Sequence, residues 1–169
     1  DEAPSPVMRP KVELPVLHQR NTNACTGFAL ANVVNFLLRI ARREAAIEVS
    51  PFMLYSMARR YDEFPGSTAD SGSSLRGAMK GWYKHGSCRN ALWKGLKMPP
   101  PAETPEHDWW LDAALRPLGA YYRVDTRSVT DMHVALTEVG VLYASVLCHD
   151  GSLEGMHQNT TKGAYWTIP

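Results

Sequence analysis

The stretch HQRNTNACTGFALANVVNFLL, residues 18–38, joins a polar, turn-rich segment directly to a long apolar run. Cys25 stands at the junction between the two. Apolar side chains follow it nearly all round a helical wheel, which predicts a buried central helix from Cys25 to about residue 45. The sequence therefore predicts a thiol at the N-terminus of a buried helix.

A thiol in this position is suited to nucleophilic chemistry. The first turn of a helix has unpaired backbone N–H groups and a partial positive charge, and both favour a thiolate over a thiol. Gln19 lies in the loop that precedes the helix. Its amide can donate a hydrogen bond to a developing oxyanion, together with the backbone N–H of Cys25. The ordinary alternatives are a buried structural cysteine and an amide that holds a turn.

Composition limits the classes of function. With 169 residues and 44% hydrophobic content, the chain suits one packed domain. A net charge of +1 gives no basic field to recruit nucleic acid. The longest apolar stretch is too short to span a membrane. The three cysteines are widely spaced without a CxxC pair, so neither a disulfide framework nor a structural zinc site is expected.

Turn and capping residues divide the rest of the chain. Proline-rich residues 1–17 are expected to form an extended arm. Capping residues at Ser50, at Ser73 or Ser74, at Thr104 and at Thr130 predict four further helices, over residues 51–64, 75–85, 105–119 and 131–140. Strands are predicted over 121–125 and 141–148, and the remaining residues indicate a loop with a strand at its very end. Helices thus come first and strands last.

The residues around Cys25 resemble the nucleophile motif of papain-like cysteine peptidases. The likeness is to that family's Q-x-G-x-C-x-S-C-W-A-F-A signature, which is matched here by Gln19, a polar loop, and Cys25 followed by TGFALA. Later segments resemble other parts of the same fold in the right order: VSPFMLYSMARRYDE, SGSSLRGAMKGWYKHGSC, ALW and MHVALTEVGVLYASVLC. The resemblance implies an α+β papain-like domain in which residues 1–169 supply mainly the helical half and the start of the β half.

The resemblance also implies an activity. The protein would be a bacterial-type cysteine peptidase that hydrolyses peptide bonds through a thioester acyl-enzyme, with no metal and no cofactor. Cys25 would be the nucleophile and Gln19 an oxyanion donor. Gly72, Ser73 and Ser74 would offer backbone groups to an extended peptide or protein substrate, although a loop and a helix cap would also account for these three residues.

The sequence departs from the family pattern at several points. Thr26 replaces the tryptophan that follows the nucleophile. Thr22 and Asn23 occupy the loop where secreted members have a disulfide cysteine, which favours a cytoplasmic location. The histidine motif GHA and the asparagine motif NSWG are missing, so the catalytic histidine and asparagine are expected beyond residue 169, on a β half that would complete the domain. His157 has a suitable spacing from Cys25, but its polar context, GMHQNTTKG, indicates a loop and argues against it.

Two other functions stay open. A papain-like module could bind peptides without cleaving them. A thiol acyltransferase of the transglutaminase type would use the same pairing of cysteine and histidine.

Overall fold

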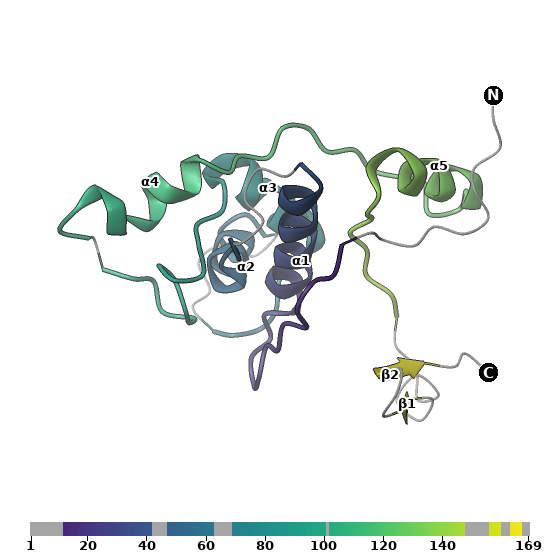
Figure 1. Cartoon of the computed structure of the whole chain (residues 1–169), viewed down its shortest axis with the longest axis horizontal. Coiled ribbons are helices and arrows are strands. Elements are labelled where there is room, and N and C mark those ends of the chain that lie inside the picture. Colours follow the sequence, from purple (N-terminus) through teal and green to yellow (C-terminus); the bar gives the residue numbers. More distant parts are fainter. Residues whose placement is uncertain are drawn as a thin grey trace.

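The computed structural model describes residues 12–41, 47–62, 69–100 and 102–147, together with the backbone of 156–159 and 163–166. Figure 1 shows its elements, which in chain order are α1 (Cys25–Ile40), α2 (Pro51–Arg60), α3 (Leu75–His85), the 3-10 helix η1 (Pro105–His107), α4 (Trp109–Ala114), α5 (Val129–Val139), β1 (Met156–Asn159) and β2 (Gly163–Trp166). None of the helices in these ranges is long and apolar enough to cross a membrane. The helical part of the predicted α+β fold is confirmed.

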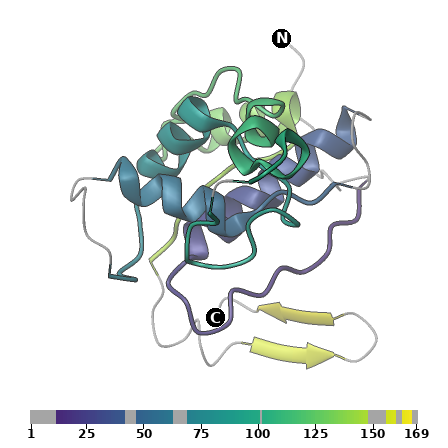
Figure 2. The same cartoon turned by 90° about the vertical axis from the view of Figure 1, so that its left-hand side faces the viewer.

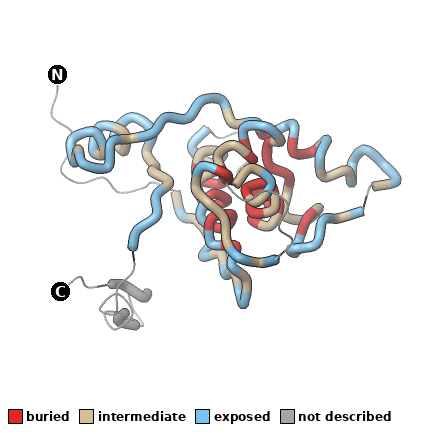
Figure 3. Tube along the Cα trace, turned by 180° about the vertical axis from the view of Figure 1, so that it is seen from behind, coloured by how far each residue is buried: buried red, intermediate tan, exposed pale blue. Residues whose placement is uncertain are grey.

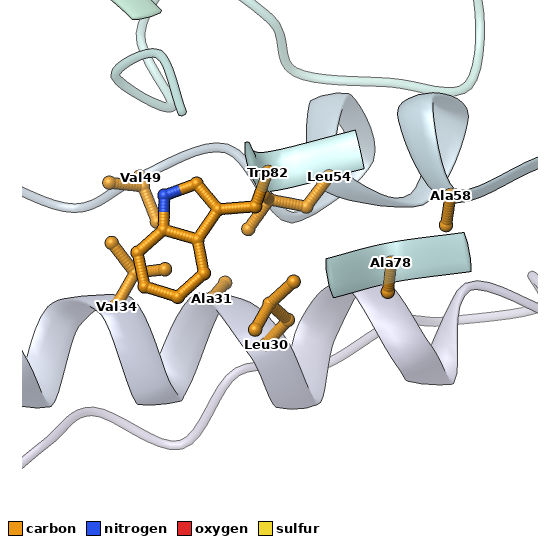
Figure 4. Close-up of a cluster of buried hydrophobic side chains, with 8 residues drawn as sticks. All are labelled: Leu30, Ala31, Val34, Val49, Leu54, Ala58, Ala78 and Trp82. Atoms are coloured by element: carbon orange, nitrogen blue, oxygen red, sulfur yellow. The ribbon is translucent and has the colours of Figure 1, made fainter. Parts of the chain in front are cut away.

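The helix α1 is the buried central helix that the sequence predicts. It begins at Cys25 and ends at Ile40, while residues 42–45, also predicted to be helical, lie outside the described residues. Eight apolar side chains form a cluster at the centre of the fold, labelled in Figure 4: Leu30, Ala31, Val34, Val49, Leu54, Ala58, Ala78 and Trp82. Because they come from α1, α2, α3 and the segment before α2, the three helices bury one another's apolar faces.

Serine caps start α2 and α3, as predicted. The Oγ atoms of Ser50 and Ser74 each accept a hydrogen bond of 3.0 Å from the backbone N–H three residues later. Gly86, with a φ of 70°, ends α3. The helix α2 ends at Arg60, short of the predicted residue 64, and residues 63–64 lie outside the described residues.

Glycines allow α2 to approach both of its neighbours closely. A Cβ atom at Gly27 of α1 would lie 2.3 Å from the carbonyl oxygen of Pro51. A Cβ atom at Gly81 of α3 would lie 2.8 Å from the Cβ of Met57. Since neither position has room for a side chain, the backbones approach more closely than larger residues would allow. The contact at Gly27 packs the first turn of α1, which contains Cys25, against the start of α2.

One predicted helix is divided in two, and the predicted start of another is wrong. Residues 105–119 do not form one helix but η1 and then α4, because the Asp108 carboxylate accepts a hydrogen bond of 3.0 Å from the Trp110 N–H and caps a new helix. The helix α5 starts at Val129, where Ser128 supplies the cap in place of Thr130.

Neither of the two strands predicted inside the chain forms. Residues 121–125 and 141–147 lie outside any helix or strand, and Cys148 lies outside the described residues. A strand is stable when its backbone pairs with neighbouring strands, and no part of the described chain pairs with these segments. In Figure 3 both segments are exposed or only half-buried, whereas the buried residues gather in and around α1, α2 and α3. The prediction that the β half begins at residue 141 is therefore wrong.

A short antiparallel hairpin forms later in the chain. Its strands β1 and β2 pair with Met156 opposite Trp166 and with Asn159 opposite Gly163, and Figure 2 shows the two arrows pointing in opposite directions. The strand expected at the very end of the chain is confirmed by β2. The prediction of a loop over residues 156–159 is wrong, because these residues have β2 as a pairing partner.

Candidate functional site

Cys25 occupies the exposed N-terminal end of α1. It is the first residue of the helix, and its thiol is free. The preceding residue, Ala24, is buried and has no side chain that could cap the helix. Because no side chain caps α1, the N–H groups of its first turn have no side-chain acceptor and can serve a negative group at this end of the helix.

Gln19 holds a closed turn in the loop before Cys25. Its Nε2 atom donates a hydrogen bond of 2.8 Å to the carbonyl oxygen of Thr22, and the Thr22 hydroxyl donates one of 2.7 Å to the carbonyl oxygen of Gln19. Arg20 between them has a φ of 56°, in the left-handed region. The amide of Gln19 thus holds a turn, which is the alternative to an oxyanion donor that the sequence leaves open. Since a side-chain amide has two N–H donors, one donor is left for a ligand.

The segment before α3 has an ordered backbone around Ser73. Gly72 has a φ of 88° and donates its N–H to the Tyr55 hydroxyl at 3.0 Å. Ser74 caps α3, and its N–H donates to Asp62 Oδ1 at 2.8 Å. Between them, the backbone N–H and carbonyl of Ser73 make no hydrogen bond to any residue in the described part of the chain. Ser73 therefore offers one free donor and one free acceptor to an extended ligand.

Two sets of hydrogen bonds join this segment to the start of α1. The hydroxyls of Thr26 and Ser73 bond to each other. The N–H of Asn23 donates to Asp70 Oδ2 at 2.9 Å. Residues 72–74 thus lie beside the first turn of the helix that begins at Cys25. The structure brings together the regions in which the sequence places the nucleophile and the substrate backbone.

Tyr143 is a neighbour of the site that the sequence did not indicate. Its hydroxyl donates a hydrogen bond of 2.9 Å to the carbonyl oxygen of Thr26. Burial, and after it the charge of the nearby Cys25, raises the pKa of the Tyr143 hydroxyl. The segment after α5 therefore passes close to the thiol. An aromatic residue in a predicted strand gives no sign of such a contact in the sequence.

Of the four histidines whose side chains the structure describes, three form side-chain hydrogen bonds, none of them to Cys25, and the fourth, His133, is exposed on α5. His18 is exposed and accepts from the Arg20 N–H at 2.9 Å. His85 pairs with the Tyr61 hydroxyl at 2.8 Å, and His107 with the Thr104 hydroxyl, also at 2.8 Å.

His157 lies on β1, opposite Tyr165. The loop context used as an argument against His157 is therefore wrong. Its side chain lies outside the described part of the structure.

The remaining thiols differ from Cys25. Cys88 is completely buried, and burial raises its pKa to about 12, so it is an unreactive structural thiol. Cys148 lies outside the described residues. The described residues also contain no group of three or more side chains that could hold a metal ion.

The fold is similar to that of a papain-like cysteine protease. The structure that establishes this is that of xylellain, a cysteine protease from Xylella fastidiosa, with a TM-score of 0.55 and 21% sequence identity. The match covers 81% of this chain and 57% of xylellain, so the chain spans less than two thirds of that protein. No protein-family model matches the sequence, and no curated protein matches it.

Proposed function

We propose that the protein is a cysteine peptidase with Cys25 as its nucleophile. The observation that carries the proposal is the exposed thiol at the uncapped N-terminus of α1, in a fold similar to that of a cysteine protease. The loop of Gln19 precedes this thiol in the chain. The segment around Ser73 is bonded to the next residue, Thr26. Nucleophile, oxyanion donor and substrate backbone would then be supplied by adjoining parts of one site.

The proposed reaction proceeds through an acyl-enzyme. The thiolate of Cys25 attacks the carbonyl carbon of a peptide bond, and the charge moves to the carbonyl oxygen. The backbone N–H of Cys25 and the amide of Gln19 donate hydrogen bonds to that oxyanion. The C–N bond then breaks, and the amine leaves with a proton from a histidinium. A water molecule gives a proton to the histidine and hydrolyses the thioester, which releases a carboxylic acid and restores the thiolate.

The substrate would bind as an extended peptide along the segment before α3. The free N–H and carbonyl of Ser73 can pair with one residue of the peptide as in an antiparallel bridge. A Cβ atom at Gly72 would meet nothing within 4 Å, so the space over this backbone is open. Ser74 acts mainly through the helix cap in this proposal, because its hydroxyl and its N–H both bond to Asp62.

The general base is assigned, by the resemblance, to a histidine beyond residue 169 on a β half of the domain. Apolar side chains that this half could cover are exposed on α5 and in the segment after it: Val129, Val134, Val139, Val146 and Leu147. Leu147 is 98% exposed. Partial coverage of xylellain is consistent with this assignment.

Hydrolysis of a peptide library by native protein tests the proposal, with cleavage products read by mass spectrometry. We expect cleavage by wild type and by Cys88→Ala, and none by Cys25→Ala. Peptide binding by wild type without cleavage would instead indicate an inactive module. Products that form only when an amine is added would indicate an acyltransferase. Cleavage that persists in Cys25→Ala would contradict the assignment of the nucleophile.

A further inference from the structure

Asp70 joins the loop before the nucleophile to the segment before α3. Its Oδ2 atom accepts a hydrogen bond of 2.9 Å from the Asn23 N–H, and its backbone carbonyl accepts one of 2.5 Å from the Asn23 side-chain amide. The two residues lie 47 positions apart in the sequence. Since Asn23 is only two residues before Cys25, these bonds fix the path of the chain into the nucleophile.

Tyr55 of α2 holds the other oxygen of the same carboxylate. Its hydroxyl donates a hydrogen bond of 2.6 Å to Asp70 Oδ1, because an ionised carboxylate can only accept. The same hydroxyl accepts a hydrogen bond of 3.0 Å from the Gly72 N–H. Burial, and after it the hydrogen bond to Asp70, raises the pKa of Tyr55, so its hydroxyl stays protonated and keeps this direction of donation.

Thr26 provides a link on the other side of the nucleophile. Its hydroxyl bonds to that of Ser73, from the same segment that contains Asp70. Cys25 is therefore flanked in sequence by two residues, Asn23 and Thr26, that are both tied to residues 70–73. Tyr55 of α2, which is only 1% exposed, holds residues 70–72 from the protein interior.

We propose that Asp70 and Tyr55 are positioning residues that hold the backbone of Ser73 at a fixed distance from Cys25. Asp70 fixes the loop that leads into the thiol, and Tyr55 fixes Asp70 and Gly72 at once. Neither side chain need contact the substrate, because each acts through the segment that it holds. The inference rests on the proposed function and names the residues that set its substrate geometry.

A comparison of two reagents measures this positioning separately from the reactivity of the thiol. Iodoacetamide alkylates Cys25 without using the Ser73 backbone. An N-blocked dipeptidyl chloromethyl ketone alkylates the same thiol and can also pair with that backbone. The ratio of the two second-order rate constants at Cys25, read by peptide mass, therefore reports how well a bound peptide is aligned with the thiol.

Asp70→Asn and Tyr55→Phe are the informative variants. In Asp70→Asn the new NH₂ group faces either the Asn23 N–H, where two donors oppose each other, or the Tyr55 hydroxyl. That hydroxyl already accepts hydrogen bonds from the Gly72 N–H and from Arg59, so either orientation loses one link. Tyr55→Phe removes the hydrogen bonds of the hydroxyl to Asp70, Gly72 and Arg59 but leaves those between Asp70 and Asn23. We expect wild type to prefer the peptidyl reagent, each variant to lose about tenfold of that preference, and iodoacetamide alone to react at a nearly unchanged rate. Asp70→Glu should restore part of the preference.

Tyr61→Phe is the matched control, because it also removes a hydroxyl that forms a hydrogen bond, here to His85 and away from the site. It should leave the ratio unchanged even if it lowers the melting temperature as much as Tyr55→Phe does. A ratio that is the same in wild type, Asp70→Asn and Tyr55→Phe would overturn the inference, as would a wild type without any preference for the peptidyl reagent. Peptide hydrolysis is measured in parallel, so that the two proposals are tested separately. If the preference for the peptidyl reagent depends on Asp70 but no peptide is hydrolysed, only the peptidase function is contradicted.

Discussion

The Tyr143 hydroxyl donates a hydrogen bond of 2.9 Å to the carbonyl oxygen of Thr26, which lies 117 positions earlier in the sequence and directly follows Cys25. Tyr143 also packs against the central apolar cluster. One side chain therefore attaches the segment after α5 to both the core and the first turn of α1. This contact places the later part of the chain beside the residue that follows the candidate nucleophile.

Tyr143→Phe should lower the free energy of unfolding by about 1 kcal/mol, because it removes one hydrogen bond to a partly buried carbonyl. Tyr122→Phe is the control, since Tyr122 is 89% exposed and should change stability little. Urea denaturation of wild type and both variants provides the measurement. Equal stabilities of the two variants would show that the hydrogen bond contributes nothing.

Gly72→Ala should destabilise the segment beside Cys25. The φ of 88° at Gly72 lies in the left-handed region, where a side chain costs about 1–2 kcal/mol, although the space around it is open. Gly119→Ala is the matched control, because a Cβ atom there also meets nothing within 4 Å and its φ is not in that region. We expect a lower melting temperature and slower peptide cleavage for Gly72→Ala alone. Identical melting curves for the two variants would contradict this reading of the backbone.

Asp112→Ala should be among the most destabilising single changes. The carboxylate is 4% exposed and pairs with Arg116 at 2.8 Å and with Arg89 at 2.7 Å. Removing one partner of a buried ion pair typically costs about 3–5 kcal/mol. Asp125→Ala also breaks a pair with an arginine, Arg127, but that pair is exposed and its loss should have little effect. Chemical denaturation that gives similar losses for both variants would refute the distinction.

Alkaline pH should weaken the fold through Cys88. Because the pKa of this thiol is raised from about 9 to about 12, the folded protein keeps a proton that the unfolded chain releases. Stability should therefore fall as pH rises from about 9 towards 12, by at most about 1.4 kcal/mol per pH unit from this group. Cys88→Ala should show a shallower decline. Parallel stability curves for wild type and Cys88→Ala would rule out this contribution.

The parts of the fold that follow from local rules were predictable from sequence. The start of α1 at Cys25, the serine caps of α2 and α3, and the end of α3 at Gly86 depend on neighbouring residues only, and all four are confirmed. The conformation of residues 141–147, which form no strand, was not predictable from local rules. Their composition favours a strand, but a strand also needs a partner, and Tyr143 instead bonds to Thr26.

The candidate site was predictable in its parts but not in its connections. Gln19, Cys25 and Gly72 stand out in the sequence because of a motif, a helix start and a glycine in a loop. Asp70 and Tyr55 carry no such signal. Their importance depends on hydrogen bonds between segments 47 and 15 positions apart, and only the packed arrangement of α1, α2 and the segment before α3 brings those segments together.

The pH dependence of Cys25 alkylation in native protein tests whether Cys25 is an activated nucleophile. Iodoacetamide labelling would be followed by peptide mass, with buried Cys88 as the internal control. An ordinary free thiol is only roughly 0.3% ionised at pH 6. We expect Cys25 to label at pH 6 at about a tenth or more of its rate at pH 9, while Cys88 stays unlabelled. Labelling of Cys25 that falls with pH like that of an ordinary free thiol would contradict its assignment as an activated nucleophile.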